Sequence, residues 1–272
     1  MVESITGIGS CRIVTPLRQG IARFNLRFNQ VRNYGFVHSS AEAVQQIRFM
    51  LGDWNPSPEI WPLISPKAQL EELLQKKHSF SDVYVTEIAS LKKITLGDHV
   101  LQLNYLARAF PGIMKDREKL KNFWSLAKAG DQAGIDAFLY ELTRVESIGP
   151  DEAEILREVR LKQMTVDDVR SDVRWIIDTL PRVIFQTHAD ARLPDGTSLP
   201  GRRQLIDTVK HAVSAEGGTA YDPTALMLAW GQDKSMEHNS TGHWTEAFSD
   251  ALFDDLWAKY LGHGPNQACS PQ

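Results

Sequence analysis

The 272-residue chain has little cysteine and no long apolar run, and these absences limit where it is expected to work. Its two cysteines, Cys11 and Cys269, are too few for a disulfide framework. No uninterrupted apolar run approaches the roughly 18 residues of a membrane helix. The opening Met1-Val2-Glu3-Ser4 lacks the basic and apolar regions of a signal peptide. We therefore expect no membrane span and a reducing, cytoplasmic location.

A basic excess and the common nucleotide-binding motifs are also missing. The formal net charge of −4 disfavours a nucleic-acid partner, because phosphate-backbone binders usually carry a clear positive excess. No GxGxxG or P-loop run is present. The pairs His188/Asp190 and Glu237/His238 lack the close, repeated His and Cys spacing of a zinc site. We expect no cofactor, no metal and no nucleic acid.

The residues that are present predict an α/β domain. A hydrophobic content of 42% with 24% charged residues is ordinary for a globular chain, and the length suits one domain with an insertion. Val83–Ile88 and Val183–His188 are apolar and β-branched, as buried parallel strands are. Strands alternate with helical segments and no hairpin signal is recognised, which predicts a single domain over 1–272. Its expected fold is three-layer α/β/α, flavodoxin-like, around a parallel sheet.

Residues 107–180 have an almost purely helical pattern. Phe123, Trp124 and Ala127 form one apolar stripe, and Thr165 begins a further helix that Pro181 ends. Because the crossover between two parallel strands needs only one helix, we interpret residues 107–180 as a mostly helical insertion.

The stretch Gly9-Ser10-Cys11 follows a short β-prone run and precedes an amphipathic segment. The turn between a strand and the helix that follows it lies at the carboxyl edge of a parallel sheet, where ligands bind. Ser10 on such a turn is placed to act as a nucleophile, or else only to cap the next helix. Cys11 is a possible thiol nucleophile, although packing in the helix as a small apolar group is the simpler interpretation.

A serine nucleophile needs a base, and two histidines near the end of the chain are candidates. His238 lies in the polar loop Gly231–Gly242 before the last helix and is preferred. His243 is the competitor, in the first turn of that helix.

Three groups are candidates for orienting the base through a hydrogen bond. Asp233 precedes His238 by five residues, and Glu237 adjoins it directly. A backbone carbonyl near Ser235 could instead accept the imidazole N–H.

Three groups near the start of the chain could hold the oxyanion. They are the Ser10 backbone N–H, Gly35 and the side-chain amide of Asn33. The alternative interpretation of Asn33 and Gly35 is a tight turn closed by an Asx hydrogen bond.

Polar residues at the ends of two later strands are expected to face the same rim and to contact substrate. Glu87 and Ser90 follow one strand, and His188 and Asp190 follow the other. Any charged member that is buried there requires a partner.

Three short blocks resemble the SGNH/GDSL hydrolases, and within them the GSCFA-type branch. Gly9-Ser10-Cys11 resembles its opening block, Asn33-Tyr34-Gly35-Phe36 its oxyanion loop, and Glu237-His238-Asn239-Ser240 its histidine block. The resemblance implies that Ser10 is the nucleophile and His238 the base. The chain departs from the family where an Asp is expected three residues before the histidine, because that position is Ser235, and in lacking a Gly-x-Asn element near Glu87.

The resemblance also implies carboxyl-ester chemistry, in bacterial members often associated with surface-polysaccharide biosynthesis. Our first hypothesis is a hydrolase that removes O-acyl (acetyl) groups from a carbohydrate or another acylated small molecule, through an acyl-Ser10 intermediate. The alternatives are an O-acyltransferase acting on a polysaccharide precursor, with Trp54 and Trp61 helping to keep water away, and a non-catalytic glycan-binding protein. The missing Asp and Gly-x-Asn favour the last.

Overall fold

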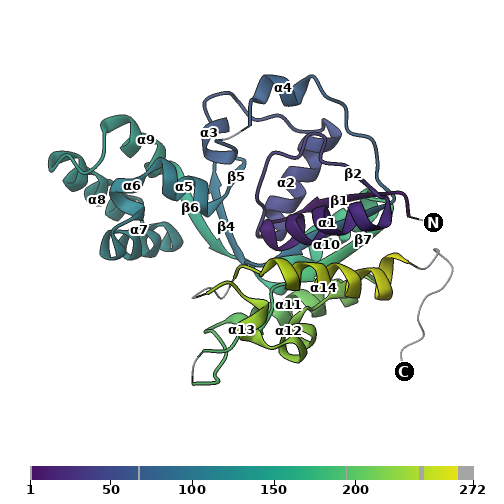
Figure 1. The fold of residues 1–272 in the computed structure, drawn as a ribbon. Coiled ribbons are helices and arrows are strands. Elements are labelled where there is room, and N and C mark those ends of the chain that lie inside the picture. The colour runs from purple at the N-terminus through teal and green to yellow at the C-terminus, as the bar shows by residue number, and fades with distance from the viewer. Residues whose placement is uncertain (1, 67, 194, 239–241, 263–272) are drawn as a thin grey trace.

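A sheet of five parallel strands forms the centre of the protein in the computed structural model, which describes residues 2–66, 68–193, 195–238 and 242–262 (Figure 1). The strand order is β2-β1-β3-β7-β8, which is the flavodoxin-like order with β7 and β8 in fourth and fifth place. Each neighbouring pair is parallel. The strands are β1 (Ser4–Ile8), β2 (Arg27–Phe28), β3 (Val83–Ile88), β7 (Val183–Thr187) and β8 (Thr219–Tyr221).

Helices cover both faces of this sheet and confirm the three-layer prediction. One core joins the sheet to α1 and α14, and a second joins it to α2, α10 and α11. The helices are α1 (Cys11–Phe24), α14 (Glu246–Leu256), α2 (Ser40–Leu51), α10 (Val166–Thr179) and α11 (Arg202–Ala215).

The alternation of side chains along β3 shows how the sequence divides these two cores. Val83 and Val85 pack into the core under α1 and α14, and Tyr84 and Ile88 pack into the opposite core. All four are fully buried, as a central strand with helices on both faces requires.

Helices α1 and α14 are in close contact at Gly20. A Cβ atom at this position would lie 2.1 Å from Cγ of Phe253, so only glycine lets the two backbones approach this closely. The N-terminal ends of both helices lie at the carboxyl edge of the sheet, beside the turn that holds Ser10.

A second, antiparallel sheet was not predicted. Its order is β5-β4-β6, with β4 (Lys92–Leu96), β5 (His99–Leu101) and β6 (Val159–Gln163). The expectation that the chain has no hairpin is therefore wrong. Gly97, with a φ of +55°, and Asp98 form a two-residue turn that joins β4 to β5. Strand β6 alternates apolar and polar residues, a signal easily overlooked between helices.

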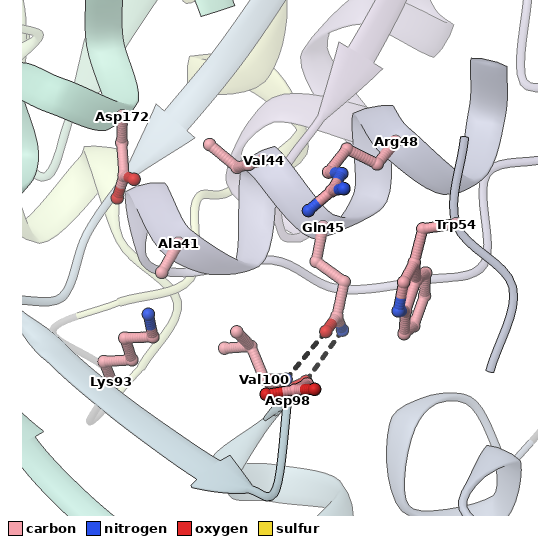
Figure 2. A pocket seen from close by; sticks show the side chains of 9 residues that line it. All are labelled: Ala41, Val44, Gln45, Arg48, Trp54, Lys93, Asp98, Val100 and Asp172. Atoms are coloured by element: carbon pink, nitrogen blue, oxygen red, sulfur yellow. Dashed lines mark hydrogen bonds between the residues drawn. The ribbon is translucent and has the colours of Figure 1, made fainter. Parts of the chain in front are cut away.

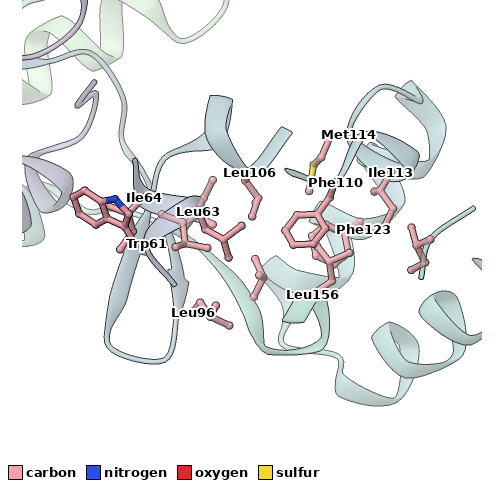
Figure 3. Packing of buried hydrophobic residues seen from close by; sticks show 14 of the residues in the cluster. Trp61, Leu63, Ile64, Leu96, Leu106, Phe110, Ile113, Met114, Phe123 and Leu156 are labelled. Atoms are coloured by element: carbon pink, nitrogen blue, oxygen red, sulfur yellow. The ribbon is translucent and has the colours of Figure 1, made fainter. Parts of the chain in front are cut away.

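The second sheet and the short helices around it enclose a separate apolar core (Figure 3). Phe123, Ile135 and Leu139 are fully or almost fully buried in it. Figure 1 shows this lobe extending away from the main sheet. Its helices are α3 (Trp61–Ile64), α5 (Leu103–Ala109), α6 (Pro111–Met114), α7 (Arg117–Ala129), α8 (Gln132–Arg144) and α9 (Pro150–Glu158), with α4 (Leu70–Leu74) beside them.

Residues 107–180 belong to two parts of the molecule. Helices α6 to α9 belong to the lobe, whereas α10 packs on the main sheet against α2 and α11. An insertion with boundaries at 107 and 180 stays a prediction.

The remaining elements lie in the C-terminal part of the described sequence. They are α12 (Thr224–Trp230), α13 (Gln232–Ser235) and a π-helical turn, η1 (Trp257–Leu261). Within the described ranges, no helix has both the length and the apolar character needed to span a bilayer.

Candidate functional site

Ser10 lies between β1 and α1, at the carboxyl edge of the main sheet. Its Oγ accepts a hydrogen bond from the Arg12 backbone N–H at 3.3 Å, so it caps α1 as one interpretation expected. The residue is 4% exposed. Capping does not prevent nucleophilic chemistry, because an Oγ that accepts one hydrogen bond still carries its own proton.

The side chain of Glu87, on the neighbouring strand β3, accepts a hydrogen bond from the Ser10 backbone. Its Oε2 accepts from the Ser10 N–H at 2.7 Å, and its Oε1 accepts from Arg12 Nε at 2.5 Å. The carboxylate is completely buried and is paired, as a buried charge must be. The Ser10 N–H predicted as an oxyanion donor is therefore engaged by Glu87 in this structure, and its role as an oxyanion donor stays a prediction.

Arg12 also reaches β7 and the loop before α14. Its Nη1 is 3.1 Å from His188 Nε2 and donates to the Gly242 carbonyl at 3.3 Å. One guanidinium thus joins three segments that are far apart in the sequence. Nothing in the sequence marked Arg12, because its partner Glu87 is 75 residues away.

His188, a predicted rim residue, lies between two arginines. Burial lowers its pKa well below the ordinary value, and the positive charges of Arg12 and Arg202 lower it further. The ring is therefore neutral at neutral pH; its Nε2 lies 3.1 Å from Arg12 Nη1, and its Nδ1 contacts Arg202 Nη1 and lies 3.2 Å from the Ala189 carbonyl. Burial and Arg12 also lower the pKa of Arg202 to about 10, which leaves Arg202 protonated.

His38 is a further residue at this edge that the sequence did not indicate. Its carbonyl accepts from the N–H groups of Ala89 and Ser90 at 2.7 and 3.0 Å, which ties the loop before α2 to the end of β3. Burial lowers the pKa of its imidazole, with opposing effects from Glu87 and Arg12.

The loop with Asn33 and Gly35 forms the Asx turn that was the alternative interpretation. Asn33 Oδ1 accepts from the Gly35 N–H at 3.2 Å, and Asn33 Nδ2 donates to the Gly7 carbonyl at 2.8 Å. Gly35 has a φ of +148°, and a Cβ there would lie 2.6 Å from Tyr105 Oη. The Gly35 N–H predicted as an oxyanion donor is thus engaged, whereas the Asn33 amide has a second hydrogen to offer.

Of the two candidate histidines, His243 lies beside Cys11, the residue after Ser10; it precedes the N-cap of α14, Thr245, and so is not in the first turn of that helix as predicted. Its Nδ1 is 3.4 Å from Cys11 Sγ, and its carbonyl accepts from the Glu237 N–H at 3.0 Å. His238 is exposed. Cys11 does not pack in the helix core but is half-buried against this ring, and burial raises the pKa of its thiol.

The three groups predicted to orient the base lie in different surroundings. Asp233 is exposed on α13, and within the described part of the chain no hydrogen bond joins it to His238 or His243. The Ser235 carbonyl accepts from the Thr245 N–H at 2.9 Å. Glu237 lines the same cavity as His243. Asn239 and Ser240 of the predicted histidine block lie outside the described residues.

The two other predicted rim residues contact neighbouring loops. Ser90 Oγ accepts from the Lys92 N–H at 3.1 Å. Asp190, buried, pairs with Arg192 at 3.3 Å and lies 3.6 Å from Arg203. No group of three or more His, Cys, Asp or Glu side chains with metal-holding geometry occurs within the described ranges.

The structure contains one cavity beside this edge and another at the β4–β5 hairpin. The smaller, of about 290 Å³, adjoins Ser10 through its neighbour Cys11. The larger, of about 430 Å³, lies between α2 and the β4–β5 hairpin (Figure 2). In it, the buried amide of Gln45 is paired with the Val100 backbone through two hydrogen bonds, at 2.8 and 2.7 Å. The larger cavity is lined by Ala41, Val44, Gln45, Arg48, Trp54, Lys93, Asp98, Val100 and Asp172.

Comparison with known sequences identifies related proteins. A family model described as the TviD N-terminal domain matches residues 3–259. The "Vi polysaccharide biosynthesis protein TviD" of Salmonella typhi is 35% identical over 253 residues, which are 92% of this chain and 30% of that protein. The chain therefore spans less than a third of the length of this relative.

Comparison with solved structures finds distant likenesses, each under 25% identical. LAE5, an alpha/beta hydrolase from the metagenome of Lake Arreo, has a TM-score of 0.45 at 8% identity, with 94% of each chain covered. A variant of Axe2, an acetylxylan esterase from Geobacillus stearothermophilus, has a TM-score of 0.43 at 10% identity, covering 94% of this chain and 93% of that chain. AlinE4, an SGNH-hydrolase family esterase, has a TM-score of 0.32 at 12% identity, covering 95% and 94%.

Proposed function

Because the chain belongs to the TviD N-terminal domain family, we propose that it performs serine-dependent acyl-ester chemistry on a carbohydrate, with Ser10 as the nucleophile. The reaction is hydrolysis of an O-acyl group, such as acetyl, through an acyl-Ser10 intermediate. The observation that carries this proposal is the position of Ser10 at the carboxyl edge of β1, with the His243 imidazole against the adjacent Cys11. The polysaccharide role in the name of the relative supports a carbohydrate substrate; membership of the GSCFA-type branch stays a prediction.

We assign the base to His243 in preference to His238. Both rings are exposed, but that of His243 contacts Cys11, the residue next to Ser10. Glu237 lines the cavity with His243 and is the carboxylate proposed to orient it, in place of Asp233.

In the first half of the reaction, Ser10 Oγ attacks the ester carbonyl carbon and its proton passes to the His243 imidazole. The tetrahedral intermediate collapses, the bond to the sugar oxygen breaks, and the imidazolium gives its proton to that oxygen. In the second half, a water proton passes to His243 while the water oxygen attacks the acyl carbon. The carboxylic acid leaves and Ser10 Oγ recovers a proton.

The oxyanion requires a donor that Glu87 now occupies. We propose that the substrate oxygen replaces Glu87 Oε2 at the Ser10 N–H, while Oε1 keeps its ion pair with Arg12. The oxyanion then accepts a charge-assisted hydrogen bond from the Ser10 N–H in place of the carboxylate oxygen. The second N–H of the Asn33 amide is the further donor proposed.

Transfer of the acyl group to a sugar hydroxyl is the second candidate. The low exposure of Ser10, 4%, favours it, because an acyltransferase must keep water from the acyl-enzyme. The relative is named for biosynthesis, a role that fits the addition of acyl groups.

Turnover of p-nitrophenyl acetate tests both candidates. We expect p-nitrophenol release in water for the hydrolase, and release that rises with added sugar acceptors for the transferase. Ser10→Ala and His243→Gln should abolish release, and His238→Gln should leave most of it. Ser171→Ala, a matched change at an exposed serine of α10, is the control. Unchanged release in Ser10→Ala, or none in the wild type under either condition, refutes the proposal and favours a non-catalytic glycan-binding role.

A further inference from the structure

A small polar cavity lies between the N-terminal halves of α1 and α14, directly beside the Ser10 turn. The two helices touch at Gly20 and Phe253, and the cavity lies toward the ends at which both helices begin. Its volume is about 290 Å³, near the lower end of the roughly 300–1,000 Å³ of small-molecule sites. It is lined by Cys11, Thr15, Gln19, Glu237, His243, Trp244, Glu246 and Ser249.

Three of the lining residues have a buried polar atom without a hydrogen-bond partner in the described structure. They are Gln19 Oε1, Trp244 Nε1 and Ser249 Oγ. Ser249 is 1% exposed and Trp244 is 7% exposed, so bulk water does not solvate these side chains freely. Buried polar groups are almost always paired, so these three atoms require partners inside the cavity, either water or the polar groups of a ligand that displaces it.

The chemistry of the three atoms restricts the ligand. The indole offers an N–H donor, the amide oxygen an acceptor, and the hydroxyl can do either. No lysine or arginine lines the cavity, and the carboxylates of Glu237 and Glu246 border it, so the group held inside carries no negative charge. Hydroxyl groups, or an acetamido group, combine donors and acceptors in the required way.

We propose that this cavity binds a neutral sugar unit through Gln19, Trp244 and Ser249, and that it is the carbohydrate subsite of the Ser10 reaction. The inference rests on the proposed function in that the bound sugar would present its ester or hydroxyl to Ser10 and His243. Any acidic group of a larger substrate would lie outside the cavity, away from Glu237 and Glu246.

Alkylation of Cys11 provides a direct measure of occupancy, because its thiol lines the cavity. In a Cys269→Ser background Cys11 is the sole cysteine. Its rate of reaction with N-ethylmaleimide is measured alone, with glucose, and with N-acetylglucosamine. At a sugar concentration ten times the Kd, mass action leaves about one-eleventh of the cavity free, so we expect about tenfold slower labelling. Protection by both sugars indicates recognition of hydroxyls, and protection by N-acetylglucosamine alone indicates the acetamido group.

Two variants show whether protection comes from this cavity. Gln19→Leu and Ser249→Ala should each lose most of it, whereas Gln204→Leu, the same change on the exposed surface of α11, should keep it. Absence of protection by both sugars, or full protection in both cavity variants, overturns the inference. Repeating the assay in Ser10→Ala separates it from the proposed function: protection that persists there supports the subsite whether or not Ser10 is the nucleophile.

Discussion

The carboxyl edge of the main sheet and the lobe around the second sheet are built from opposite kinds of buried residue. The lobe buries apolar side chains such as Phe123 and Leu139 and keeps its ion pairs exposed. The edge buries Glu87, His188 and Asp190 and pairs them with arginines and backbone groups. Burying charge does not stabilise a fold more than apolar packing does, so the difference fits our proposal that chemistry takes place at the edge and not in the lobe.

Removal of Glu87 from the edge should lower the free energy of unfolding more than any other change proposed for the edge or the lobe. Glu87→Ala leaves Arg12, whose side chain is 12% exposed, without its carboxylate, and we expect a loss of about 3–5 kcal/mol in the free energy of unfolding. Urea denaturation followed by circular dichroism measures it. Glu87→Gln is the matched control, because its amide oxygen can still accept from the Ser10 N–H. A loss below about 1 kcal/mol, the range of exposed pairs, would show that the edge carries no special cost.

A cavity created in the lobe should lower the free energy of unfolding nearly as much and leave the catalytic turnover unchanged. Leu139 is 1% exposed, and Leu139→Ala should lower the free energy of unfolding by about 2–5 kcal/mol. Turnover of p-nitrophenyl acetate per folded molecule should stay at the wild-type value. Loss of turnover in a sample that is still fully folded would mean that the lobe takes part in the site.

Glu42, whose carboxyl accepts a hydrogen bond from the His38 N–H at this edge, should also give a pH-dependent stability. Burial raises the pKa of Glu42, at the start of α2, from 4.5 to about 7. The protonated form therefore favours the folded state, and its contribution is complete below about pH 4.5 and is lost as the pH rises through 7. The change is about 3 kcal/mol at roughly 1.4 kcal/mol per pKa unit. Glu42→Gln should flatten this part of the unfolding profile; an equal slope in both proteins contradicts the assignment.

An exposed ion pair of the lobe should have the smallest effect. Arg144 and Glu141 lie 2.7 Å apart on α8 with side chains 60% and 58% exposed. We expect Arg144→Gln to change the free energy of unfolding by about 0.5 kcal/mol or less. Denaturation in low and high salt checks it, and a change above about 1 kcal/mol would show that surface charges hold the lobe together.

Local pattern was sufficient to predict the main sheet. Val83–Ile88 and Val183–Thr187 are buried on both faces, and only a central parallel strand needs such an apolar run. The second sheet was missed because β6 is short and lies between helices, and because the Gly97-Asp98 turn was not recognised as a hairpin. Its partners β4 and β6 are more than 60 residues apart, a separation that periodicity does not encode.

The site was predicted in part for the same reason. The Gly9-Ser10 turn indicates the carboxyl edge of the sheet. Glu87 and His188 were predicted to lie at the same edge because they stand at the ends of strands. The pairing of Glu87 with Arg12 and the Ser10 N–H depends on the register between β1 and β3, so the sequence could not show that this oxyanion donor is engaged. The choice between His238 and His243 depends on the bend of one loop, and five residues of spacing do not determine it.

The central claim is that Ser10 is the nucleophile, and a covalent label tests it most directly. The intact chain is treated with a fluorophosphonate, digested, and the modified peptide is identified by mass spectrometry. We predict one adduct, on Ser10, that is lost in Ser10→Ala and greatly slowed in His243→Gln. An unlabelled Ser10, or an adduct on Cys11 or on another residue that persists in Ser10→Ala, would contradict the account.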